Sequence, residues 1–147
     1  MLAISIGANL TLGGVLLGML YGRRGVDAAR LTDPEQALAQ FRSLDPAARG
    51  HATLASDGRA ALIELDDGTF GLVERRGRRW AARTLDPREL VGCDAAGEGT
   101  IHLRFADFGW PRACVRLEDP ATRERWLGRL GARRRSDGDD LPEVHDA

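Results

Sequence analysis

The sequence contains no lysine, and all 21 of its basic residues are arginine. A chain without lysine forms no lysine Schiff base, anchors no pyridoxal phosphate and has no lysine-tipped phosphate-binding loop. The 22 acidic residues nearly balance the arginines, which leaves a net charge of −1. Because nucleic-acid-binding domains normally carry a basic excess, we expect no nucleic-acid partner.

Cysteine and histidine are also scarce, with two cysteines and three histidines in 147 residues. The histidines are widely separated, and the sequence has neither a His-Glu-x-x-His nor a Cys-x-x-Cys motif. It has no Gly-x-Ser-x-Gly motif either. We therefore expect no metal site, no cofactor and no catalytic residues, so that the protein is not an enzyme. Cys93 and Cys114 lie in runs whose pairing would bring them close, and we expect both to be buried, reduced thiols.

The first 22 residues have no charged side chain. A helix from Leu2 to Tyr21 would rise by about 30 Å, which is the thickness of the hydrocarbon core of a bilayer. Arg23 and Arg24 follow this run, whereas no basic residue precedes it. The length of the apolar run predicts that residues 1–22 form a transmembrane helix. Because positive charge stays on the cytoplasmic side, the arginines after it predict the orientation of this helix. We expect a single-pass protein of the inner or cytoplasmic membrane, with its C-terminal domain in the cytoplasm.

An alternative interpretation of this segment is a signal peptide whose cleavage releases a periplasmic binding domain. A signal peptide has a basic start, a shorter apolar core and small residues at its cleavage site. The run in this chain ends at Met19-Leu20-Tyr21-Gly22-Arg23, which fits a cleavage site poorly. These differences favour the anchor.

Three glycines of this segment, Gly14, Gly18 and Gly22, share one face of the predicted helix. Small residues at this spacing allow a second membrane helix to pack closely. The sequence therefore allows a homodimer through the glycine face. The alternative is that glycine is simply common in membrane helices.

Residues 23–49 are predicted to form a juxtamembrane link and one short helix. Thr32 and Glu35 have the spacing of a capping box, with Thr32 as the N-cap, and Pro34 suits the first helical turn. Leu38 and Phe41 lie on one side of a helix over about residues 34–44. We expect this helix to be a packing element or a spacer.

From residue 50 onward the hydrophobic pattern alternates as in strands. Seven runs with strand character are separated by turn sequences such as Asp57-Gly58 and Asp66-Asp67-Gly68. The runs are residues 51–56, 60–65, 69–75, 78–85, 89–94, 100–105 and 112–118. Their connections are too short for crossover helices, so the strands are predicted to pair antiparallel.

A second helix is predicted after the seventh run, with Asp119 as N-cap and Pro120 in its first turn. Trp126 and Leu130 lie four residues apart on its apolar face, and Gly131 suits a C-terminal stop. Residues 133–147 are basic and then acidic, with too few apolar residues to fold. We expect a disordered tail there.

Seven antiparallel strands followed by an amphipathic helix with a tryptophan resemble the pleckstrin-homology-like (PH-like) barrel, over residues 50–132. Trp126 matches the tryptophan of that family's closing helix, while a lipocalin-like or split-barrel arrangement shares much of the pattern. The resemblance implies a mainly β (α+β) fold that binds other molecules without chemistry of its own, as an interaction or scaffold protein for an unknown protein partner. Lipid-binding members of the family use basic residues between the first two strands, where this chain has only Arg59 beside Asp57.

Four arginines, Arg75, Arg76, Arg78 and Arg79, instead flank the turn between the third and fourth runs. Such a cluster would bind phosphates or anionic lipid headgroups, at roughly 1 kcal/mol per charge near an anionic surface. The alternative is a solvated hairpin tip that Glu74 partly neutralises. Besides the two functions above, the sequence thus allows an anionic-lipid sensor.

Overall fold

The computed structural model describes residues 30–97 and 99–138 of the chain. The predicted transmembrane segment with Gly14, Gly18 and Gly22 lies outside the described residues, as do residues 139–147 of the predicted tail. Within residues 30–97 and 99–138, none of the helices combines the length and the apolar character that a membrane span needs.

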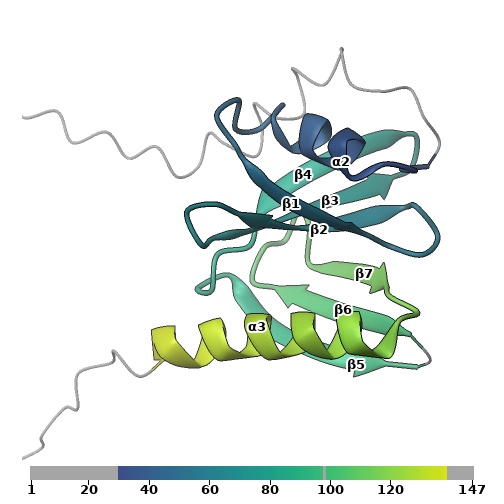
Figure 1. The fold of residues 1–147 in the computed structure, drawn as a ribbon. Coiled ribbons are helices and arrows are strands. Elements are labelled where there is room, and N and C mark those ends of the chain that lie inside the picture. Colours follow the sequence, from purple (N-terminus) through teal and green to yellow (C-terminus); the bar gives the residue numbers. More distant parts are fainter. Residues whose placement is uncertain (1–29, 98, 139–147) are drawn as a thin grey trace, which may run out of the picture.

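The described part of the chain is mainly β, with seven strands in two antiparallel sheets (Figure 1). The first sheet has the order β1 (Gly50–Leu54), β2 (Ala60–Leu65), β3 (Phe70–Arg76) and β4 (Arg79–Thr84). The second has the order β5 (Leu90–Ala96), β6 (Thr100–Phe105) and β7 (Arg112–Arg116). Helix α2 (Pro34–Phe41) precedes the strands and helix α3 (Pro120–Gly138) follows them. Each strand overlaps one predicted run, so the strands and their antiparallel pairing are confirmed.

Glycines with a left-handed backbone make the tight turns of the first sheet. Gly58, Gly68 and Gly77 have φ angles of 67°, 83° and 65° in the three successive connections between β1 and β4. Side chains other than glycine rarely adopt this conformation, which explains why these turns contain glycine. The β1–β2 and β3–β4 turns lie at the same end of the antiparallel sheet, because alternate connections share an end.

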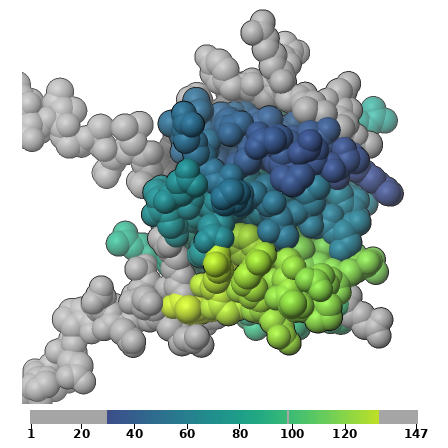
Figure 2. Space-filling model, in the orientation of Figure 1, coloured from purple at the N-terminus to yellow at the C-terminus, as the bar shows by residue number. Residues whose placement is uncertain are grey.

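The first sheet is covered on both faces (Figure 1). Its outer face packs against α2, and its inner face packs against the second sheet and α3. Leu62 and Leu72 therefore face the second sheet, whereas Ile63 and Val73 face α2, and all four are buried. Figure 2 shows the two ends of the described chain, α2 and α3, on opposite sides of the molecule.

Helix α2 begins at a different cap from the predicted one. The N-cap is Asp33, because its carboxylate accepts a hydrogen bond from the Glu35 amide at 2.8 Å. Thr32 precedes the cap, and its amide donates to the side chain of Gln36 at 2.9 Å. The prediction of Thr32 as the cap was wrong because a nearer carboxylate competes for the free amides of the first turn.

Helix α3 covers the inner core beside β5 and β6 (Figure 1). Asp119 caps it, accepting hydrogen bonds from the amide and the hydroxyl of Thr122 at 3.0 and 2.6 Å. These bonds lower the pKa of Asp119. Trp126 and Leu130 are buried in the core, where the Trp126 ring meets Phe70 edge to face at a centroid distance of 5.5 Å.

Helix α3 continues to Gly138 and does not stop at Gly131. Residues 133–138 are therefore helical, and the prediction of a disordered tail from residue 133 was wrong for this part. Alanine and arginine are strong helix formers, and a glycine within a helix costs only about 1 kcal/mol. The helix propensity of the alanine and arginines after Gly131 outweighs the cost of the glycine.

Candidate functional site

The four hairpin arginines surround the β3–β4 turn, but their side chains divide between the faces of the sheet. Adjacent residues of a strand point to opposite faces. Arg76 pairs with Arg79 across the hairpin, and Arg75 pairs with Trp80. Arg76 and Arg79 therefore share the inner face with the core residue Ala81, whereas Arg75 lies on the outer face.

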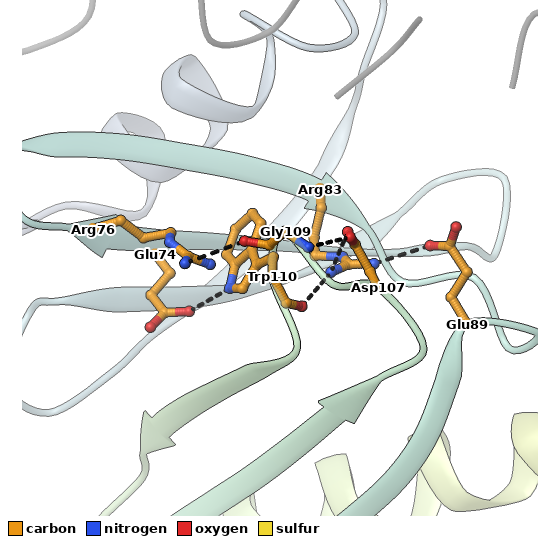
Figure 3. Close-up of polar contacts among 7 residues, drawn as sticks. All are labelled: Glu74, Arg76, Arg83, Glu89, Asp107, Gly109 and Trp110. Carbon is orange, nitrogen blue, oxygen red and sulfur yellow. Dashed lines mark hydrogen bonds and ion pairs between the residues drawn. The ribbon is translucent and has the colours of Figure 1, made fainter. Parts of the chain in front are cut away.

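Two of these arginines contact aromatic rings. The Cζ atom of Arg75 lies 5.7 Å from the ring centroid of Trp80, and that of Arg76 lies 5.0 Å from the centroid of Trp110. Arg76 also donates from Nη2 to the carbonyl of Gly109 at 3.4 Å (Figure 3). These contacts tie the hairpin to the loop between β6 and β7.

Arg78 and Arg79 differ from these two. Both side chains are exposed, and neither has a hydrogen bond, an ion pair or a ring contact with another residue of the described part of the chain. The hairpin therefore presents two uncompensated positive charges, on Arg78 and Arg79. The other two arginines, Arg75 and Arg76, already contact aromatic rings of the domain.

Trp110, whose ring contacts Arg76, links the β6–β7 loop of the second sheet to strand β3 of the first. Its buried indole donates from Nε1 to the Glu74 carboxylate of β3 at 3.1 Å (Figure 3). Burial raises the pKa of Glu74, against the opposing effects of the Trp110 hydrogen bond and the Arg76 charge. The Glu74 carboxylate thus links β3 to the β6–β7 loop through Trp110, and it also lies near the positive charge of Arg76.

Arg83 of β4 was not among the residues singled out from the sequence, yet it is only 6 % exposed. Its guanidinium forms ion pairs with Glu89 at 2.9 Å and Asp107 at 3.5 Å (Figure 3). It donates to the carbonyl of Trp110 at 3.1 Å and lies 3.9 Å from the ring centroid of Phe105. Arg83 therefore connects β4 with the segment before β5 and with the β6–β7 loop.

Strand alternation is the signal that points to Arg83. Ala81, Arg83 and Leu85 fall on one face of the fourth run, and the flanking two residues pack in the core. A charged residue between two apolar ones on a strand face is expected to be buried with an opposite charge. The identity of its partners is not visible in the pattern, because tertiary structure brings Glu89 and Asp107 to it.

The two cysteines lie on opposite faces of the second sheet. Cys93 of β5 pairs with Leu103 and Cys114 of β7 pairs with His102, and these two residues are neighbours on the intervening strand β6. Two strand spacings separate the backbones by about 10 Å, beyond the roughly 7 Å that a disulfide allows. The expectation that the cysteines come close was wrong, and Cys114 is exposed rather than buried.

Asp94, His102 and Cys114 are aligned across the three strands of the second sheet. This order of acid, imidazole and thiol is the one that a cysteine nucleophile uses. An activated cysteine has a lowered pKa, whereas the partial desolvation of the Cys114 thiol and the nearby Glu74 carboxylate raise the pKa of Cys114, with Arg112 opposing them. Among the residues with described positions, no group of three histidine, cysteine or acidic side chains is arranged to hold a metal ion.

The fold and this region together define a mainly β domain of two antiparallel sheets, closed by a C-terminal helix and carrying an arginine hairpin at one end. Comparisons with protein-family models, with curated proteins and with solved structures found no match to this chain.

Proposed function

We propose that this protein is a single-pass membrane protein that holds a non-enzymatic, PH-like interaction domain at the cytoplasmic face. The observation that carries the PH-like assignment is the order of the elements. Seven antiparallel strands in two sheets precede a helix that buries Trp126 and Leu130 in the core between and beside the sheets. The proposed anchor is the uncharged segment 1–22 with the arginines that follow it.

The roles of the charged residues support binding rather than catalysis. Arg83 and Glu74 join the two sheets, and Asp119 caps a helix. The pKa of Cys114 is raised, which is opposite to what an activated thiol requires. The exposed charges at the hairpin, Arg78 and Arg79, are suited to contact with an external partner.

Membrane fractionation of the full chain tests this function. We expect the protein to stay in the membrane after alkaline carbonate extraction and to have the mass of the complete sequence. A C-terminal alkaline phosphatase fusion is expected to be inactive, because the enzyme requires the periplasm. A soluble protein, or an active phosphatase fusion, would contradict the proposed anchor or its orientation.

A periplasmic binding domain released by signal cleavage is the alternative that the same experiment separates. It requires a mass that lacks about the first twenty residues. In this released form Cys93 and Cys114 would not form a disulfide with each other, because they lie on opposite faces of the second sheet and two strands apart. Crosslinking of the intact protein in its native membrane would then identify the protein partner that the anchored form binds.

Recognition of anionic lipid is a second candidate function, which the unpaired charges of Arg78 and Arg79 favour. Hydrogen exchange of the full chain in nanodiscs tests it. Segment 75–80 should exchange more slowly in discs that contain phosphatidylglycerol than in discs of phosphatidylcholine alone. The protection should disappear in Arg78→Gln/Arg79→Gln and persist in Arg104→Gln, a control arginine that pairs with Asp94 on the second sheet. Equal exchange in both lipids would exclude this function.

A further inference from the structure

Phe108 is the most exposed large apolar side chain of the described region, at 102 % of its reference area. The next is Val91, at 47 %. A fully exposed phenylalanine buries none of its ring in the fold, so the whole side chain is available for a contact outside the domain. The residue lies in the loop between β6 and β7, two residues before the buried Trp110.

The backbone around Phe108 is held by the domain. Asp107 accepts a hydrogen bond from the amide of Gly109 at 2.8 Å and pairs with the buried Arg83 through its other oxygen (Figure 3). The carbonyl of Gly109 accepts from Arg76. The polar groups on both sides of Phe108 are therefore already bound, and the loop offers an external partner an apolar ring beside positive charge.

The arginine hairpin lies next to the β6–β7 loop. Arg76 binds the residue next to Phe108, and Arg78 and Arg79 follow it around the β3–β4 turn with exposed side chains. An exposed aromatic ring on a loop next to exposed arginines suits the interface of an anionic bilayer, since the ring enters the acyl boundary while the guanidinium groups bind phosphates.

The start of the described chain lies at the same end of the molecule. The amide of Leu31 donates to the carbonyl of Gly58 in the β1–β2 turn at 2.7 Å, and the amide of Arg75 donates to the carbonyl of Arg59 at 2.8 Å. The described chain thus begins at the end of the first sheet that carries the arginine hairpin. A domain tethered there would present this end to the bilayer.

We propose that Phe108 inserts into the interface of an anionic membrane while Arg78 and Arg79 bind its headgroups. This surface rests on the proposed membrane anchoring and adds a defined orientation of the domain against the bilayer. An apolar pocket of a protein partner is the competing occupant, but the charge beside the ring favours the bilayer.

Photocrosslinking of the full chain tests this proposal. Phe108 is replaced by p-benzoylphenylalanine, which keeps the aromatic ring, and the chain is reconstituted in vesicles of phosphatidylcholine with phosphatidylglycerol. We expect a lipid adduct at this position and about a tenfold lower yield in pure phosphatidylcholine, in high salt or in the Arg78→Gln/Arg79→Gln background. The same probe at Asp66, an exposed residue at the opposite end of the first sheet, should give no lipid adduct.

The outcomes separate this surface from the anchor. A chain that remains in the vesicles but gives no lipid adduct at Phe108 would overturn the surface and leave the anchor in place. So would equal adducts at Phe108 and Asp66, equal yields in both lipids, or an adduct with a protein instead of lipid in native membranes. A chain that does not stay in the vesicles would overturn the proposed membrane function itself.

Discussion

Removal of the two carboxylates that neutralise Arg83 should destabilise the domain more than removal of Arg83. In Glu89→Gln/Asp107→Asn the guanidinium stays buried and loses both counter-charges. Its Nε atom already has no hydrogen-bond partner among the described residues. An uncompensated buried charge typically costs about 3–5 kcal/mol.

The opposite substitution, Arg83→Met, should be milder because the charges that remain are partly hydrated. The side chains of Glu89 and Asp107 are 53 % and 28 % exposed, so water solvates them once the guanidinium is gone. The methionine side chain still packs against Phe105. What is lost is mainly the donor to the Trp110 carbonyl, at about 1–3 kcal/mol.

Urea unfolding of residues 30–138, followed by circular dichroism, measures the difference. The free energy of unfolding should fall furthest in Glu89→Gln/Asp107→Asn. Addition of Arg83→Met to this double variant should return it to the level of Arg83→Met alone. Asp94→Asn, which breaks the exposed pair with Arg104, serves as a control and should change stability by less than about 1 kcal/mol. A larger loss in Arg83→Met than in the double variant would refute the reasoning.

Three further predictions concern the core and the sheet junction. Gly71→Ala should cost about 1–3 kcal/mol, because a Cβ at this position would lie 2.4 Å from the Phe41 ring. Gly128→Ala, on the open side of α3, is the control and should not destabilise the domain, so urea midpoints that fall equally in both variants would contradict this prediction. Trp126→Phe should lose much less than the roughly 3–5 kcal/mol expected for Trp126→Ala, because the indole Nε1 is buried without a described partner; calorimetric melting of both variants checks the order. Glu74→Gln should stabilise the domain at neutral pH, because a raised pKa means that ionisation of Glu74 opposes folding. This gain should vanish as the pH falls below the ordinary glutamate pKa of 4.5, and pH-dependent urea melts that show a loss at neutral pH would contradict it.

The local pattern of the sequence predicted most of the architecture. Alternation of apolar residues located all seven strands, and the shortness of the connections between them predicted the antiparallel pairing, because both signals act over a few residues. The cap of α3 at Asp119 was visible for the same reason. Errors arose at helix ends, where Asp33 outcompetes Thr32 and where α3 runs through Gly131, since small energy differences decide such boundaries.

The candidate site depended on contacts between residues far apart in the chain. Four adjacent arginines indicated one cluster, but the pleat of the strand and the positions of Trp80 and Trp110 leave only Arg78 and Arg79 uncompensated. The sequence by itself thus determined the strands, the turns and the absence of lysine, since these follow from residue type and local spacing. The tertiary structure alone decided which charges are buried with partners and which side chain, Phe108, is left exposed beside them, because packing between the two sheets sets both.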